Sequence, residues 1–190
     1  MKLAVIFPGI GYHTDKPLLY YAKRLVKSMG YEILEVPYGN FPEGVKGSQE
    51  KMREAFESAV AQTKNLLKDT AFENCDRLLF ISKSIGTAVA AEYAKQHGLK
   101  ADFVFYTPVE ETFLFVEQGG IVFHGTKDAW VETEIVKREC GKKGLPLFIT
   151  EGANHSLETG NVEQDLCNLR EIMNRTKRYI EQIEKETSEN

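Results

Sequence analysis

Short, almost continuously apolar runs alternate along the chain with longer stretches in which apolar residues recur every three or four positions. Runs of the first kind are typical of strands covered on both faces, and stretches of the second kind are typical of amphipathic helices. Six strands are predicted, over residues 3–8, 31–38, 76–82, 101–108, 119–125 and 145–152. Five helices are predicted, over residues 16–30, 48–69, 85–98, 131–142 and 161–186.

The regular alternation of strand and helix predicts an α/β fold with about six mostly parallel strands and helices on both faces of the sheet. A length of 190 residues and the lack of any linker predict one domain, residues 1–190. Residues 109–118 are a weak point in this pattern, because a full crossover helix usually needs about a dozen residues. A cramped turn or an irregular loop is expected there.

Charge and cysteine content narrow the class of protein. The formal net charge is −4, with both signs interspersed, so no electrostatic footprint for nucleic acid or an anionic membrane is present. No apolar run reaches the roughly 18 residues that span a bilayer. The three cysteines, Cys75, Cys140 and Cys167, are far apart and form no metal-ligand pattern. A reduced, cytoplasmic protein without a metal is therefore expected.

Polar residues follow the predicted strands at the positions where a parallel sheet binds ligands, outside the carboxyl ends of its strands. Ser84 follows the third strand in "SKSIG", Asp128 follows the fifth in "HGTKDAW", and His155 follows the sixth in "EGANHSLE". A serine hydroxyl needs a neighbouring base to become a nucleophile, and a neutral histidine can be that base. A carboxylate can hold the imidazole in the required tautomer.

These motifs resemble those of the α/β-hydrolase superfamily, in which serine, acid and histidine occur in the same chain order. "SKSIG" is similar to the G-x-S-x-G elbow, with Ser82 in place of the first glycine. "FPGIGY" is similar to the oxyanion loop, with Pro8 in place of its histidine. The resemblance implies a minimal, cap-less member of the fold, without the family's two antiparallel N-terminal strands, and implies catalytic roles for Ser84, Asp128 and His155.

The same resemblance implies an oxyanion hole made of backbone N–H groups. The N–H of Ile85 follows the nucleophile at a helix N-terminus, and the N–H of Ile10, or of its neighbour Gly11, is the expected second donor. The implied activity is that of a carboxylesterase or thioesterase that acts on a small acyl substrate through an acyl-enzyme intermediate, without a cofactor. A peptidase or amidase of the same fold, and a binding module without turnover, are the alternatives.

Each of these residues also has a plainer interpretation. Ser84 could cap the helix that follows it, and Asp128 could cap the helix that begins near Trp130. Glu110 or Glu111, which follow the fourth strand, could replace Asp128 as the acid. The order of serine, aspartate and histidine at successive strand ends favours the catalytic interpretation.

Five residues are predicted to border a substrate pocket: Tyr12, His13, Lys83, Phe113 and Trp130. Lys83 is either solvated or favours anionic substrates, because it lies beside the nucleophile. His124 is expected to pack at a strand end. "GIGYHT" invites a dinucleotide-binding interpretation, but the third glycine of that motif is missing. The substrate, the oligomeric state and the presence of a lid are left open by the sequence.

Overall fold

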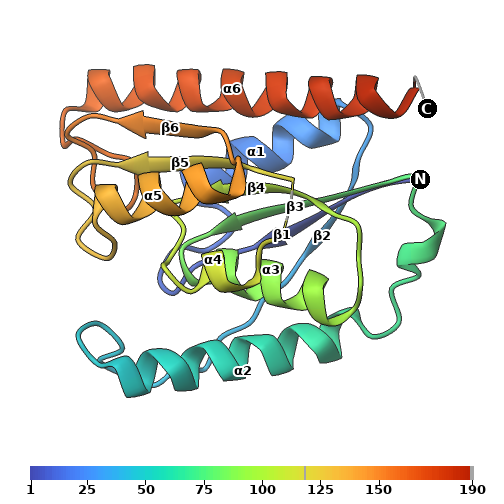
Figure 1. The fold of residues 1–190 in the computed structure, drawn as a ribbon, viewed down its shortest axis with the longest axis horizontal. Coiled ribbons are helices and arrows are strands. Elements are labelled where there is room, and N and C mark those ends of the chain that lie inside the picture. The colour runs from blue at the N-terminus through green and yellow to red at the C-terminus, as the bar shows by residue number, and fades with distance from the viewer. Residues whose placement is uncertain (118, 189–190) are drawn as a thin grey trace.

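A single parallel sheet forms the centre of the protein in the computed structural model, which describes residues 1–117 and 119–188 (Figure 1). Its strands lie in the order β2-β1-β3-β4-β5-β6, and every neighbouring pair is parallel. The strands are β1 (Lys2–Phe7), β2 (Glu32–Glu35), β3 (Arg77–Lys83), β4 (Asp102–Tyr106), β5 (Ile121–Gly125) and β6 (Leu147–Thr150). The prediction of six parallel strands is confirmed.

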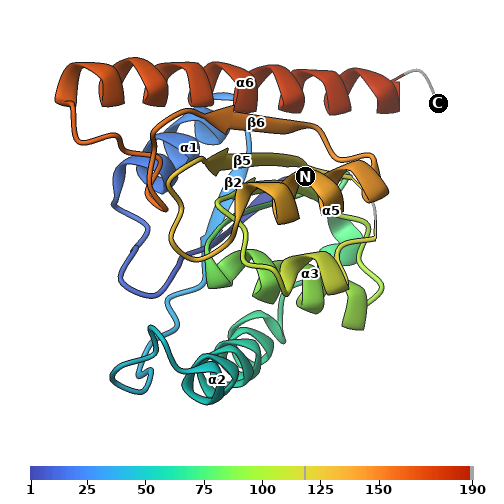
Figure 2. The same ribbon diagram turned by 60° about the vertical axis from the view of Figure 1, so that its left-hand side comes forward.

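Helices cover both faces of this sheet and make a three-layer sandwich. Two of them, α1 and α6, lie on one face, and the other four lie on the opposite face (Figures 1 and 2). The helices are α1 (Pro17–Ser28), α2 (Gln49–Leu67), α3 (Ile85–Gln96), α4 (Thr112–Phe115), α5 (Thr133–Lys143) and α6 (Val162–Ser188), with a 3₁₀ turn at Phe72–Asn74. None of the helices within the described residues is long and apolar enough to cross a membrane.

The central strand β3 explains why the sequence pattern is continuous rather than alternating. Its side chains point to opposite faces in turn. Leu78 and Phe80 belong to the apolar cluster under α2, α3 and α5, whereas Leu79 and Ile81 belong to the cluster under α1 and α6. Both faces are buried, so every position of the strand from Leu78 to Ile81 carries an apolar residue.

The connection between β4 and β5 is short, as expected, and its described part contains one helical turn. This turn, α4, packs on α3. The hydroxyl groups of Thr87 and Thr112 are hydrogen bonded at 2.6 Å. The rings of Phe56 and Phe115 stack with centroids 5.7 Å apart, which ties α4 to α2 as well. The compact turn therefore belongs to the packed layer of helices.

Candidate active site

The turn from β3 to α3 holds Ser84 in a strained backbone conformation. Its φ is 55° and its ψ is −129°, a region that residues with a side chain rarely adopt. The Ser84 side chain makes no capping hydrogen bond to α3. Its backbone N–H donates to the carbonyl of Tyr106 at 3.1 Å, which holds the turn against β4. The helix-cap interpretation is therefore wrong, and the hydroxyl is free to face another partner.

Small residues permit this sharp turn. A Cβ atom on Gly86 would lie 2.4 Å from the carbonyl oxygen of Pro8 and 2.5 Å from that of Phe7, so only glycine fits there. Ser82 is completely buried, and its hydroxyl donates to the carbonyl of Val104 at 3.2 Å. Ser82 therefore occupies the position that requires a small residue, as its place in the motif predicts, and points away from solvent.

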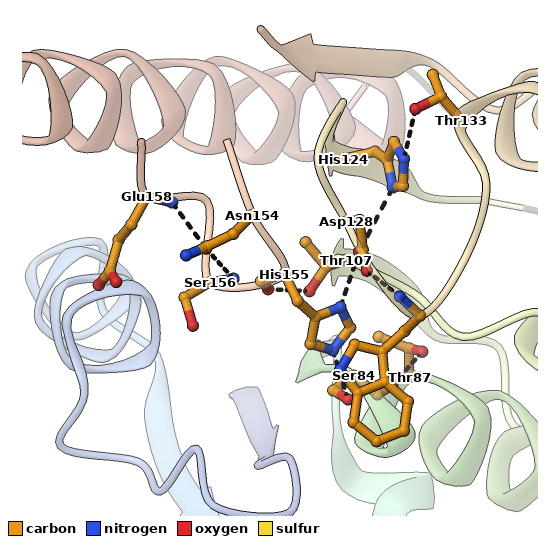
Figure 3. A network of polar contacts seen from close by, with 11 residues as sticks. Ser84, Thr87, Thr107, His124, Asp128, Thr133, Asn154, His155, Ser156 and Glu158 are labelled. Carbon is orange, nitrogen blue, oxygen red and sulfur yellow. Dashed lines mark hydrogen bonds and ion pairs between the residues drawn. The ribbon is translucent and has the colours of Figure 1, made fainter. Parts of the chain in front are cut away.

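Ser84, His155 and Asp128 form one chain of hydrogen bonds (Figure 3). The Ser84 hydroxyl lies 2.8 Å from Nε2 of His155, and Nδ1 of the same imidazole lies 2.7 Å from Oδ2 of Asp128. The loops that carry Asp128 and His155 are closely packed. A Cβ atom on Gly125 would lie only 2.3 Å from the carbonyl oxygen of Ala153. Ser84 and His155, which are 71 positions apart in the sequence, therefore meet with Asp128 at one edge of the sheet.

The surroundings of Asp128 favour its charged form. Burial by itself raises the pKa of this carboxyl, but the hydrogen bond with His155 and the other polar groups around it together outweigh burial. The backbone N–H of Trp130 also donates to Oδ1 at 2.8 Å. The pKa of Asp128 is therefore below its ordinary value. This N–H comes from the segment before α5, whose N-cap is Glu132, so the interpretation of Asp128 as a helix cap is wrong.

His155 is kept neutral by its surroundings. Burial lowers the pKa of its imidazole most, the hydrogen bond to Asp128 raises it, and the nearby charge of Lys83 lowers it further. The net pKa is below the ordinary value of 6.5. The backbone carbonyl of His155 accepts a hydrogen bond from the Thr107 hydroxyl at 2.9 Å, which fixes the loop against the end of β4. The imidazole can therefore accept a proton near neutral pH.

Glu110 and Glu111 do not take the place of Asp128. Both are exposed at the start of α4, and it is Asp128 that is hydrogen bonded to the histidine.

The expected oxyanion loop is a tight turn closed by two hydrogen bonds between Gly9 and Tyr12, of 3.1 and 3.2 Å. This turn uses the N–H of Tyr12 but leaves those of Ile10 and Gly11 outside it. The N–H groups of Ile10, Gly11 and Ile85 have no backbone hydrogen-bond partner among the described residues. A Cβ atom on Gly9 would lie 3.0 Å from Cβ of Ser84, so the turn lies directly against the elbow.

Among the predicted pocket residues, Trp130 packs beside the imidazole of the hydrogen-bonded chain. Its ring centroid is 5.6 Å from that of His155, and the side chain is 38% exposed. His13 is exposed, and its Nδ1 accepts the backbone N–H of Asp15 at 3.3 Å. Tyr12 is buried and accepts the N–H of Leu18 at 3.1 Å. Phe113 was predicted wrongly, because it packs into the core beneath α4.

Lys83 also differs from its prediction, because it is 1% exposed and neither solvated nor open to a pocket. Since side chains alternate along a strand, Lys83 points to the face of β3 that α1 and α6 cover. Its Nζ lies over the ring of Tyr12, 5.0 Å from the centroid. Burial lowers the pKa of Lys83 from 10.5 to about 7, although the charges of Asp128 and Glu158 oppose this.

His124 is a polar neighbour of the site that the sequence did not single out as functional. It is completely buried, and its Nδ1 lies 3.8 Å from Oδ2 of Asp128 (Figure 3). Its Nε2 lies 3.1 Å from the hydroxyl of Thr133. The sequence held a sign of this contact, because His124 lies at the end of the strand that precedes Asp128, four residues before that acid.

A cavity of about 830 Å³ lies at the amino ends of β3 and β4, opposite the hydrogen-bonded chain. Two smaller clefts, of about 360 and 350 Å³, lie at the carboxyl edge of the sheet. Over residues 1–117 and 119–188, no three side chains of histidine, cysteine, aspartate or glutamate are placed to hold a metal ion.

The sequence matches no family model and no curated protein. Solved structures of α/β hydrolases match almost the whole chain, so the protein has the α/β-hydrolase fold that its motifs imply. Est1E from Butyrivibrio proteoclasticus has a TM-score of 0.69 at 11% identity, with 95% of this chain and 87% of that chain covered. A serine hydrolase homologue from Coxiella burnetii has a TM-score of 0.62 at 15% identity over 90% and 84%. A serine hydrolase without a lid from Xanthomonas campestris has a TM-score of 0.58 at 12% identity over 91% and 81%.

Proposed function

We propose that the protein is a serine hydrolase that cleaves an ester or thioester of a small acyl substrate. The observation that carries this proposal is the unbroken chain of hydrogen bonds from the Ser84 hydroxyl through His155 to Asp128, with Ser84 on a strained turn. A cap or a purely structural serine needs neither the strain nor the partner. The serine hydrolases that share the fold support the same class of reaction.

In the first half of the reaction, Oγ of Ser84 attacks the acyl carbonyl carbon while Nε2 of His155 takes the hydroxyl proton. The carbonyl oxygen becomes an oxyanion that accepts hydrogen bonds from the N–H groups of Ile85 and Ile10, with Gly11 as the neighbouring donor. The bond to the leaving alcohol or thiol then breaks, and His155 returns the proton to that group. Asp128 stabilises the imidazolium that forms in between.

In the second half, a water molecule attacks the acyl-enzyme. His155 takes a proton from the water, the bond between the acyl carbon and Oγ breaks, and Ser84 regains its proton. The lowered pKa of His155 keeps the imidazole unprotonated and ready for both steps at neutral pH. An alcohol or a thiolate leaves more easily than an amine, so esters and thioesters are favoured over amides.

A fluorophosphonate probe tests this proposal, because it reacts with an activated serine without requiring knowledge of the substrate. Labelling of the wild-type protein at neutral pH and its loss in Ser84→Ala are expected. Ser82→Ala is the matched control, since Ser82 is buried two residues away and should leave labelling intact. If folded wild-type protein is not labelled, the proposal is overturned in favour of a binding module that retains the fold.

A peptidase or amidase differs only in the leaving group. Comparison of kcat/KM for an ester and an amide with the same acyl group separates the two activities. A higher kcat/KM for the ester is expected, since an alcohol leaves more easily than an amine.

A further inference from the structure

An apolar cleft of about 360 Å³ lies between the first half of α2 and the N-terminal half of α3. Its walls are Met52 and Phe56 from α2, Ile85 and Ala88 from α3, and Val109 from the loop after β4. The lining is therefore almost entirely hydrocarbon. A concave apolar surface with polar groups at one end is the usual form of a small-molecule site.

The cleft is continuous with the proposed oxyanion donors. Ile85 supplies one backbone N–H, and its side chain lines the cleft. Ile10, the proposed second donor, packs in the same apolar cluster as Ile85, Met52 and Phe56. A carbonyl group that is hydrogen bonded to these two N–H groups therefore lies at the mouth of the cleft.

The position of His155 determines which part of a substrate can bind in the cleft. The imidazole must protonate the leaving group, so that group lies on the side of His155 and Trp130, where the loops after β5 and β6 end. None of the cleft residues comes from those loops. The remaining substituent of the tetrahedral carbon is the acyl chain, and it points toward α2 and α3.

We propose that this cleft binds the acyl chain of the substrate and selects a neutral aliphatic acyl group of about four to eight carbons. The volume is roughly twelve times the ~30 Å³ that one water molecule occupies in the liquid, so a chain of this length fits within the cleft. This inference rests on the proposed hydrolase function and adds to it the chemical class of the substrate.

The charges at the rim agree with a neutral chain. Arg53 and Glu111 carry opposite charges at the edge of the cleft, and Gln49 is uncharged. Arg53 is 74% exposed and also lies 3.8 Å from Glu57. The rim thus carries no excess of positive charge that would attract an acyl group with a carboxylate at its far end.

The test compares kcat/KM for the p-nitrophenyl esters of acetic, butyric, octanoic and lauric acid. In the wild type, kcat/KM should rise from acetate to butyrate or octanoate, by up to about fourfold for each methylene that becomes buried, and should rise no further for laurate. Met52→Trp fills the cleft and should lower the ratio of octanoate to acetate activity by at least about tenfold. Met52→Ala enlarges the cleft and should move the optimum to longer chains.

The second cleft supplies a matched control. It has about 350 Å³ between α1, α6 and the loop after His155, and exposed Leu166 lies at its edge. Leu166→Trp is the same kind of substitution there and should leave the chain-length preference as in the wild type. The thermal unfolding midpoint of each variant shows whether it is folded.

Three outcomes overturn the inference. If Met52→Trp lowers the activity on acetate and octanoate equally, or if Leu166→Trp shifts the preference instead, the acyl chain does not bind in this cleft. Labelling of Ser84 by the fluorophosphonate probe would then still support the hydrolase function. If folded protein neither cleaves any of the esters nor is labelled, the proposed function fails and the inference fails with it.

Discussion

Nδ1 of His124 lies 3.8 Å from Oδ2 of Asp128, the same oxygen that accepts the hydrogen bond from His155. His124 is completely buried, and no hydrogen-bond partner of its Nδ1 is found among the described residues. The tautomer with its proton on Nδ1 points that N–H edge at the carboxylate, and Nε2 then accepts from the Thr133 hydroxyl. His124 is therefore placed to hold Asp128 in position and to stabilise its charge.

Substitution of His124 should lower activity through Asp128. His124→Leu removes the N–H edge that faces the carboxylate at 3.8 Å, a distance too long for a hydrogen bond. Since that edge stabilises the charge of Asp128 only through space, a loss of up to about tenfold in kcat/KM on an acetate ester, or about 1.4 kcal/mol, is expected. The amide of His124→Asn can mimic the Nδ1 edge and should retain most of the activity. The amide of His124→Gln mimics Nε2 and should behave like leucine. Equal losses in the asparagine and leucine variants would show that the contact with Asp128 is not what matters.

Buried Lys83 should make the stability of the protein depend on pH. Its pKa is 10.5 in the unfolded chain and about 7 in the folded protein, so the unfolded state binds more protons between these values and stability rises with pH there. Lys83→Met removes this penalty. Urea unfolding should show the variant to be more stable by several kcal/mol at pH 6, since one pKa unit corresponds to about 1.4 kcal/mol. The difference should shrink toward pH 10; a difference independent of pH would contradict the assignment.

The same substitution should change the pH dependence of the reaction. The charge of Lys83 helps to lower the pKa of His155, and loss of that charge raises it. The acid limb of the profile of fluorophosphonate labelling rate against pH should therefore move to higher pH in Lys83→Met. Lys16→Met is a suitable control, because Lys16 also lies over the Tyr12 ring but is exposed. An acid limb unchanged by Lys83→Met would show that Lys83 does not act on the base.

The strain in the backbone of Ser84 should be measurable as a lower free energy of unfolding. A residue with a side chain in such a backbone conformation costs of order 1–3 kcal/mol, and glycine is free of most of that cost. Ser84→Gly should therefore be more stable than Ser84→Ala by about 1 kcal/mol or more in urea unfolding, while neither is labelled by the probe. Ala61→Gly, at an exposed position within α2, should show the opposite sign, a loss of about 0.5–1 kcal/mol.

The fold could be predicted because each strand carries its own evidence. Apolar residues such as Leu79 and Phe80 must fill both faces of a covered sheet. Continuous apolar runs that alternate with amphipathic helices therefore predict parallel pairing. The meeting of Ser84 with His155 followed from the same geometry, since carboxyl ends of parallel strands share one edge. What could not be predicted was the direction of individual side chains.

Lys83 and Phe113 illustrate this limit. A lysine beside a nucleophile was expected to be solvated, but the alternation along β3 turns it under Tyr12 and into a buried layer. Phe113 was assigned to a pocket because its segment had no predicted structure, whereas the single turn of α4 directs it into the core. His124 was expected only to pack, although it precedes Asp128 by four residues, because the 3.8 Å approach of the two side chains depends on the conformation of the turn after β5.

Gly86 should be the least replaceable residue of the elbow that takes no part in the chemistry. A Cβ atom there would lie 2.4–2.5 Å from the carbonyl oxygens of Pro8 and Phe7, both backbone atoms that cannot rotate away. Pro8 is in addition the acceptor of a hydrogen bond from the buried Tyr38 hydroxyl. Gly86→Ala must therefore push α3 away from β1, which moves Ile85 relative to Ile10. A loss of several kcal/mol in urea unfolding is expected, together with slower labelling of Ser84 in the fraction that remains folded.

Gly141→Ala, within α5 and with open space around its Cβ position, should instead be neutral or stabilising by up to about 1 kcal/mol. If Gly86→Ala resembled Gly141→Ala, the close approach of α3 to the end of β1 would be disproved, and the placement of the two oxyanion donors with it.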